Sequence, residues 1–176
     1  MENKLIFLID LDRITILQKG LATVLIFSEN EIVAGSVCNQ TQVVATLAAQ
    51  LHKSNLRGLP GIAVFVSNLT AEQLIFKRDL HTDFIEHMYV KSSINSELYY
   101  VAALLPERLL QHQIIFWRLG VYIEIFTTEM VLHIKNLLQK DCNSLARISS
   151  LDELRLLVTQ NEAADLYTKT VQTMFF

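Results

Sequence analysis

Short runs of apolar residues, many of them β-branched, alternate along this chain with segments that carry apolar residues at helical spacing. Residues 62–66 form an uninterrupted apolar run, which is typical of a strand buried on both faces. Before it, residues 43–51 place apolar side chains three and four positions apart, which predicts an amphipathic helix. Asn39, with Gln42 three residues on, has the spacing of a capping box and is the predicted start of this helix. A buried strand needs helices on its faces, so the sequence predicts an α/β fold with a mixed sheet and flanking helices.

The other elements are predicted from the same patterns. The first 37 residues indicate antiparallel strands at 4–18 (with a bend), 21–27 and 31–37. Further strands are expected at 98–105 and 121–126, and helices at 82–91, 106–119, from 128 and from 150, whereas 73–80 fits either. Ser150 and Glu153 have the spacing of a capping box.

The length of 176 residues suits one domain, 1–176, with an inserted subdomain at about 70–120 and a weakly patterned tail at 161–176. With 51% hydrophobic and 19% charged residues, the chain can bury a core and is not expected to be disordered. The net charge of -3 provides no basic field for a phosphate backbone, so no nucleic-acid partner is expected.

Neither a membrane span nor a signal peptide is expected. The apolar stretches are far shorter than the roughly 20 residues of a spanning helix. An acid at Glu2 and another at Asp10 interrupt the start of the chain, unlike a signal peptide. Cys38 and Cys142 are too few for a disulfide framework and predict two reduced thiols. These features together predict a cytoplasmic protein.

The strongest candidate for chemistry is the pair Asp10 and Asp12. Carboxylates two positions apart on a strand share a face and could share a Mg²⁺ ion. Haloacid-dehalogenase-type phosphatases use Asp-x-Asp followed by Gly-Thr, but Arg13-Ile14-Thr15 follows here, and their later acidic pair has no match. A ribonuclease-H-like nuclease would need further strand acids, and Glu124 alone is available. The remaining interpretation is that both acids are structural, at a bend or a solvated edge.

Other signatures of catalysis and ligand binding are missing from the sequence. The five histidines are scattered without zinc-ligand spacing, and no glycine-rich phosphate motif occurs. The sequence therefore predicts no enzyme, no catalytic residues, no metal site and no cofactor. Trp117 falls in a helical apolar stripe, which favours a place in the core over an interface. Met174-Phe175-Phe176 is expected either to dock on this domain or to bind something else.

The order of several segments resembles that of a known family. They are Glu31–Val37, Gln42–Leu47, Ile62–Ser67 and Gln73–Arg78, followed by Tyr100–Ala103 and Leu119-Gly120-Val121. In this order and spacing, about residues 5 to 140 resemble the PilM family of type IV pilus and DNA-uptake assembly proteins, HofM-like members included. That family belongs to the actin-like superfamily, whose domains share a ribonuclease-H-like fold. The chain looks like a single lobe of that fold.

The resemblance implies a site and a function. Asp10, Asp12 and Thr15 occupy the phosphate-loop position of nucleotide-binding relatives, but the glycine of their Asp-x-Gly hairpin is missing. With only one lobe, the ancestral ATP site would be incomplete, so no nucleotide binding is expected. The family's function would make this chain a scaffold at the inner face of the inner membrane, gripping the cytoplasmic tail of a PilN-like membrane protein.

Further possibilities stay open at this level. The surface expected to accept the tail lies between the first sheet and the segment from Leu74 to Leu105. A homodimer is left open. The alternatives to a pilus scaffold are a Mg²⁺-dependent phosphatase-like enzyme using Asp10 and Asp12, and an adaptor domain of another secretion or signalling complex.

Overall fold

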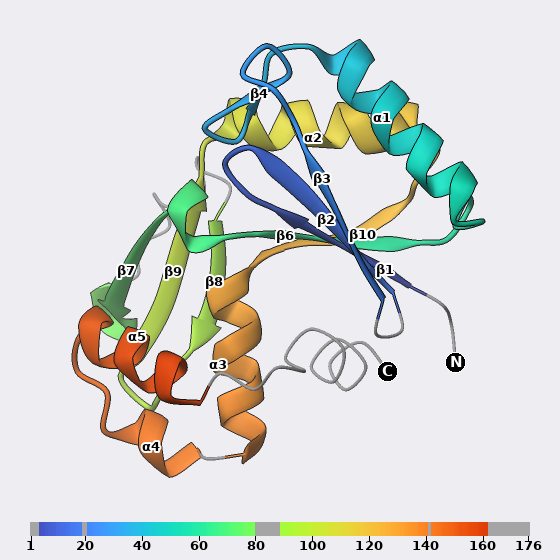
Figure 1. Cartoon of the computed structure of the whole chain (residues 1–176). Coiled ribbons are helices and arrows are strands. Elements are labelled where there is room, and N and C mark those ends of the chain that lie inside the picture. The colour runs from blue at the N-terminus through green and yellow to red at the C-terminus, as the bar shows by residue number, and fades with distance from the viewer. Residues whose placement is uncertain (1–3, 19–20, 80–88, 141, 162–176) are drawn as a thin grey trace. The chain divides into compact units, whose positions relative to one another are not determined.

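The chain folds into two compact units (Figure 1). The computed structural model describes residues 4–18, 21–79, 89–140 and 142–161. Unit 1 comprises Met1–Leu69 with Leu105–Thr127, and unit 2 comprises Thr70–Leu104 with Thr128–Phe176. The expected single domain with an insertion at about 70–120 stays a prediction, although the contacts group residues 70–104 with residues from 128 onward. Of the expected tail at 161–176, all but the first residue lies outside the described residues.

Unit 1 is built on a five-stranded mixed sheet. Its strands are β1 (Leu5–Ile9), β2 (Arg13–Gln18), β3 (Leu21–Ile26), β6 (Gly61–Phe65) and β10 (Ile123–Thr128), in the order β10-β6-β1-β2-β3. β1 runs parallel to β6 and antiparallel to β2, and β2 runs antiparallel to β3. Two short strands, β4 (Ile32–Val33) and β5 (Ser36–Val37), form a separate hairpin. α1 (Gln40–Lys53) and α2 (Pro106–Arg118) lie on one side of the five-stranded sheet (Figure 1).

Two predicted strands of unit 1 are interrupted. The bend expected within 4–18 is a complete hairpin turn, because β1 and β2 pair with each other across Asp10–Asp12. The strand expected at 31–37 turns back at Ala34 and Gly35, which have φ values of 48° and 76°. A Cβ on Gly35 would lie 2.5 Å from the side chain of Leu69, so both conformation and space favour glycine there.

The core of unit 1 lies between α2 and the sheet. Phe116 of α2 packs on Phe7 of β1 with ring centroids 4.7 Å apart, and His112 meets the ring of Phe65 edge-on. The predicted start of α1 is confirmed, because the side chain of Asn39 accepts a hydrogen bond from the backbone N–H of Gln42. The side of the sheet that faces α2 is therefore covered by packed aromatic and aliphatic side chains.

In the part of unit 2 that the structure describes, a three-stranded antiparallel sheet packs with three helices. The strands are β7 (Thr70–Phe76), β8 (Tyr89–Ser93) and β9 (Leu98–Leu104), in the order β7-β9-β8. The helices are α3 (Glu129–Lys140), α4 (Cys142–Ala146) and α5 (Leu151–Gln160). Tyr100 and Leu98 of β9 share a buried cluster with Ile134 of α3 and Leu154 of α5, which holds the sheet to the helices.

The sequence predictions for unit 2 have mixed outcomes. The ambiguous segment 73–80 is a strand as far as Phe76. The helix predicted at 82–91 is wrong from Tyr89 onward, where β8 begins, and its first part lies outside the described residues. The capping box of Ser150 and Glu153 at the start of α5 is confirmed in both directions. Within the described ranges, no helix has both the length and the apolar character needed to cross a bilayer.

Candidate functional site

The predicted phosphate-loop position is the turn between β1 and β2. The structure places Asp10 and Asp12 in this turn rather than on a strand. Arg13 binds the carboxylate of Asp12 with two bonds, from Nε at 2.7 Å and from Nη2 at 3.3 Å. The guanidinium of Arg13 thereby holds the pKa of Asp12 below its usual value. Asp12 is therefore already neutralised by its own neighbour.

The backbone of this turn is also engaged. The N–H of Leu11 donates to Oδ1 of Asp10 at 2.7 Å, and the carbonyl of Leu11 accepts from Gly35 at 2.7 Å. The N–H of Asp10 donates to the carbonyl of Arg13, which closes the turn. A phosphate group needs free backbone N–H groups directed at it. The N–H groups of Asp10 and Leu11 do not meet that need in this conformation.

A concave site of about 470 Å³ opens beside the turn. Asp10, Asp12 and Glu29 all line it, together with Arg13 and Asn68. Thr15, the third residue predicted at this position, does not line it; it lies within β2, opposite Leu8 of β1. Across the described ranges, no three His, Cys, Asp or Glu residues are grouped so that they could hold a metal ion. The structure thus brings two of the three predicted residues together, in an acidic and arginine-bound setting.

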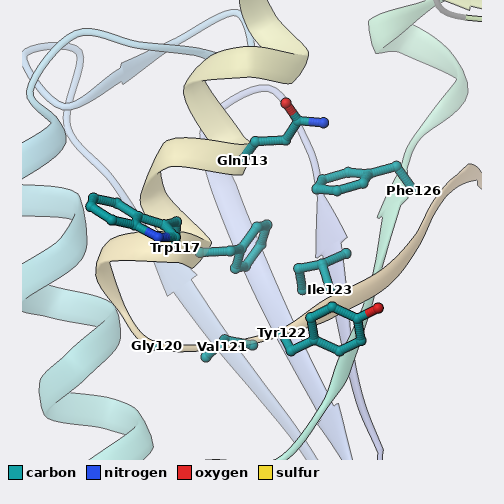
Figure 2. A pocket seen from close by; sticks show the side chains of 8 residues that line it. Gln113, Trp117, Gly120, Val121, Tyr122, Ile123 and Phe126 are labelled. Atoms are coloured by element: carbon teal, nitrogen blue, oxygen red, sulfur yellow. The ribbon is translucent and has the colours of Figure 1, made fainter.

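A second concave site, of about 360 Å³, lies where the end of α2 meets β10 (Figure 2). Its lining is mostly apolar and aromatic, with contributions from Phe116, Trp117, Val121, Tyr122, Ile123 and Phe126. Figure 2 shows Phe126, Ile123 and Tyr122 gathered on one side of the end of α2, with the Trp117 ring on the other side. Trp117 is 80% exposed and Tyr122 is 72% exposed. Large aromatic side chains exposed around an apolar hollow are typical of a surface that binds a partner.

The prediction of a core position for Trp117 is wrong. The buried face of α2 carries Leu109, His112 and Phe116, and Trp117 is one residue beyond Phe116, about 100° further around the helix. After α2, the chain turns at Gly120, whose φ of 67° favours glycine, and Tyr122 follows in the segment that leads into β10. The phase of the helix could have indicated the exposed Trp117, but no sequence signal paired it with Tyr122.

β10 is an edge strand of the five-stranded sheet. Among the described residues it neighbours only β6. An edge strand presents backbone N–H and C=O groups that can pair with an added strand. The apolar hollow therefore lies beside a backbone that can accept an extended peptide.

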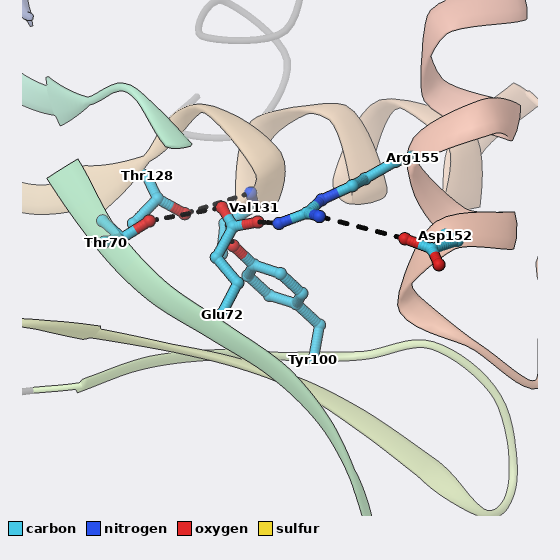
Figure 3. Close-up of polar contacts among 7 residues, drawn as sticks. All are labelled: Thr70, Glu72, Tyr100, Thr128, Val131, Asp152 and Arg155. Carbon is cyan, nitrogen blue, oxygen red and sulfur yellow. Dashed lines mark hydrogen bonds and ion pairs between the residues drawn. The ribbon is translucent and has the colours of Figure 1, made fainter. Parts of the chain in front are cut away.

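Unit 2 contains a buried polar cluster of a different kind (Figure 3). The side chain of Glu72, on β7, is only 1% exposed. Its carboxylate accepts from the hydroxyl of Tyr100 at 2.8 Å and the hydroxyl of Thr70 at 3.2 Å, and Nη2 of Arg155 lies 3.1 Å away. Burial, followed by the charge of Glu72, raises the pKa of Tyr100. The phenol therefore stays protonated and acts as a donor that ties β9 to β7.

Comparisons with solved structures place this fold among known proteins. One similar structure is the cytoplasmic domain of EpsL, an inner membrane component of the type II secretion system of Vibrio cholerae. It has a TM-score of 0.51 and 7% identity, and the match covers 75% of this chain and 57% of that one. Another is the PilM-PilN type IV pilus biogenesis complex, with a TM-score of 0.59, 10% identity and coverage of 78% and 50%. No family model and no curated protein sequence matches the chain.

The mixed sheet with flanking helices matches the actin-like domains of PilM and EpsL, as the order of the sequence segments predicted. The chain spans about half the length of these solved structures. At such low identity the likeness concerns the fold, and the binding partners of those proteins are not thereby transferred to this chain.

Proposed function

We propose that this chain is a non-catalytic assembly protein of a type IV pilus-like or type II secretion-like machine, and that it binds the tail of a membrane-anchored partner. The observation that carries the proposal is the fold shared with PilM and EpsL. PilM was solved with PilN, and the EpsL domain is the cytoplasmic part of an inner membrane component. The proposed location is accordingly the cytoplasmic face of the inner membrane, reached through the partner.

The hollow between α2 and β10 offers a surface for such a tail. An extended peptide would pair with the edge of β10 and insert one apolar side chain into the hollow beside Tyr122 and Phe126. Gln113 is the polar side chain that lines the hollow, where it can bond to peptide backbone. The surface expected from sequence, between the first sheet and residues 74–105, draws on both units and stays a prediction.

Affinity for the tail is expected to be roughly micromolar, because a disordered peptide loses conformational entropy when it binds. Trp117 is the sole tryptophan of the chain, so its fluorescence reports on this site directly. Synthetic cytoplasmic tails of inner-membrane assembly proteins should shift and saturate this emission. The tails of pilus and type II secretion proteins, titrated in parallel, would separate the two kinds of machine.

Matched variants test the place of binding. Tyr122→Ala should weaken tail binding at least tenfold, since it removes an exposed aromatic wall of the hollow. Leu110→Ala, an exposed apolar position on the same helix outside the hollow, should leave the affinity unchanged. Equal losses in both variants, or no saturable signal with any tail, would refute the proposed site.

The other candidate functions draw different support. An adaptor role in a secretion complex is also supported by the likeness to EpsL, and the titration with the tails of type II secretion proteins tests it. The phosphatase-like alternative would have to use Asp10 and Asp12, but Asp12 is held by Arg13 and both acids lie in a turn. We therefore propose that the chain acts by binding rather than by catalysis.

A further inference from the structure

β3 is the second edge of the five-stranded sheet, and it is unusually apolar for an edge. Within the described residues it pairs with β2 alone. Leu21 is 74% exposed, Val24 52% and Ile26 69%, and none of the six residues of the strand is charged. Edge strands are commonly guarded by charges, prolines or bulges that prevent pairing with another chain. The side chains of β3 provide no such protection.

The direction of the backbone groups on β3 follows from one hydrogen bond. The N–H of Phe27 donates to the carbonyl of Asp12 at 2.8 Å, which continues the register of β2 and β3. In an antiparallel strand, successive residues direct their N–H and C=O groups alternately to either side. Leu21, Thr23 and Leu25 therefore direct these groups to β2, whereas Ala22, Val24 and Ile26 direct theirs to the open edge.

The same alternation assigns the side chains to faces. Leu25 lies opposite the buried Ile14 of β2, while Val24 and Ile26 extend from the other face. Ala22, Val24 and Ile26, whose backbone groups are directed to the open edge, therefore extend their exposed side chains from this second face. A second strand at this edge would satisfy the backbone and cover Val24 and Ile26 together.

We infer that this edge pairs with the same edge of a second copy of the chain. A two-fold axis perpendicular to the sheet keeps the same face of both copies on the same side. Two opposed residues of a hydrogen-bonded pair must then both direct their backbone groups to the open edge, so both have even numbers and their sum is even. Centring the axis on Val24 pairs Val24 with itself and Ala22 with Ile26, so that every outward N–H finds a carbonyl. An uncharged strand can pair with its own copy without bringing like charges together.

The interface is small. Six residues a side cover less than the roughly 1,200 Å² of a standard interface, so the dimer is expected to be weak, with a dissociation constant of about 10 μM. The prediction is a concentration-dependent dimer that extends the sheet from five strands to ten. This association is independent of tail binding at β10, which lies at the opposite edge.

Sedimentation equilibrium tests the interface with matched variants. Val24→Lys places two like charges on the two-fold axis and should abolish the dimer. Val33→Lys makes the same change at an exposed position of unit 1 outside β3 and should preserve it. Circular dichroism melts of both variants check that each is folded. A monomeric wild type, or a dimer that survives Val24→Lys, overturns the proposal.

A second experiment tests the register. Directly opposed residues of a hydrogen-bonded pair lie about 5.5 Å apart between Cα atoms, within the range that a disulfide can bridge. With the exposed Cys38 and Cys142 replaced by serine, Val24→Cys should form a covalent dimer in oxidised glutathione, and Val33→Cys should not. Amide exchange should slow on dimerisation at Ala22, Val24 and Ile26 only. Protection of these amides by a tail peptide instead of by protein concentration would assign the edge to the partner and refute the dimer.

Discussion

The two units each contain an arginine bound to a carboxylate, at similar distances but in different surroundings. In unit 1, Arg13 and Asp12 lie 2.7 Å apart in an exposed turn and are neighbours in sequence. In unit 2, Arg155 and Glu72 lie 3.1 Å apart, and the carboxylate is buried beside Tyr100. An exposed pair is screened and contributes little, whereas a buried carboxylate that loses its partners leaves them unsatisfied. Burial, rather than distance, should decide which pair supports the fold.

Acid should have the largest effect, through buried groups rather than exposed ones. Burial lowers the pKa of His112, in unit 1, and of His133, in unit 2, to about 4 each, from 6.5. Because the unfolded chain takes up the proton at higher pH, their stabilisation is complete above pH 6.5 and is lost as the pH falls towards 4. For His112 the loss is about 3 kcal/mol.

Urea titrations between pH 7 and 4 would measure this loss. His112→Leu should reduce the slope of the profile without abolishing it, because it removes the ring beside Phe65 while His133 still titrates. Asp12 has a lowered pKa, so any contribution from it would disappear only below the usual range of a carboxyl group. A profile as steep in His112→Leu as in the wild type would show that His112 does not contribute to the dependence.

Removing the buried carboxylate should have the next largest effect. Glu72→Ala leaves the buried hydroxyl of Tyr100 without its acceptor and Arg155 with only Asp152, 3.9 Å away, so the free energy of unfolding should fall by about 2–3 kcal/mol. Glu97→Ala removes an exposed acid of the same unit and should cost less than about 0.5 kcal/mol. If urea unfolding gives equal losses of unfolding free energy for Glu72→Ala and Glu97→Ala, burial does not decide which carboxylate supports the fold.

The exposed pair should be nearly neutral. Asp12→Asn and Asp10→Asn should leave the free energy of unfolding unchanged within the error of the measurement, and tail binding should persist. The same urea titrations and the Trp117 fluorescence assay would measure both quantities. Loss of biological activity at unchanged stability would instead favour the phosphatase-like alternative.

The smallest expected effect is that of nucleotide. Calorimetry with ATP and Mg²⁺ should give no binding heat, because the Leu11 N–H is taken by Asp10 and three carboxylates line the site. An inorganic phosphate titration is the control for weak anion binding at Arg13. A dissociation constant for ATP in the low micromolar range would contradict the prediction.

Local patterns predicted the elements whose signals are local. The Asn39 cap, the Ser150–Glu153 capping box and the apolar strand at 62–66 depend on neighbouring residues, and the structure contains all three. The helix predicted as far as Lys91 failed at residues 89–91, where pairing of β8 with β9 decides the conformation. The predicted strand at 31–37 also failed at Ala34 and Gly35, where the hairpin of β4 and β5 replaces a continuous strand.

The candidate sites were harder to predict than the fold. Asp10 and Asp12 were found from their spacing, but their engagement by Arg13 depends on the turn geometry. The Glu72 cluster joins residues up to 83 positions apart, and a lone glutamate in a strand carries no signal of burial. Sequence alone could suggest an order of elements similar to PilM, because that order survives where residue identity does not.

The chain crosses between its units three times, at residues 69–70, 104–105 and 127–128. On the ribosome, unit 1 therefore cannot finish folding until α2 and β10 emerge, well after β6 has been synthesised. Until α2 has emerged, it cannot cover its side of the sheet, so Phe7 and Phe65 lack their ring contacts with Phe116 and His112. Such delayed closure by distant segments slows folding and leaves apolar surface open to wrong contacts. Nascent chains should accordingly bind hold-type chaperones most strongly before residue 127 leaves the exit tunnel.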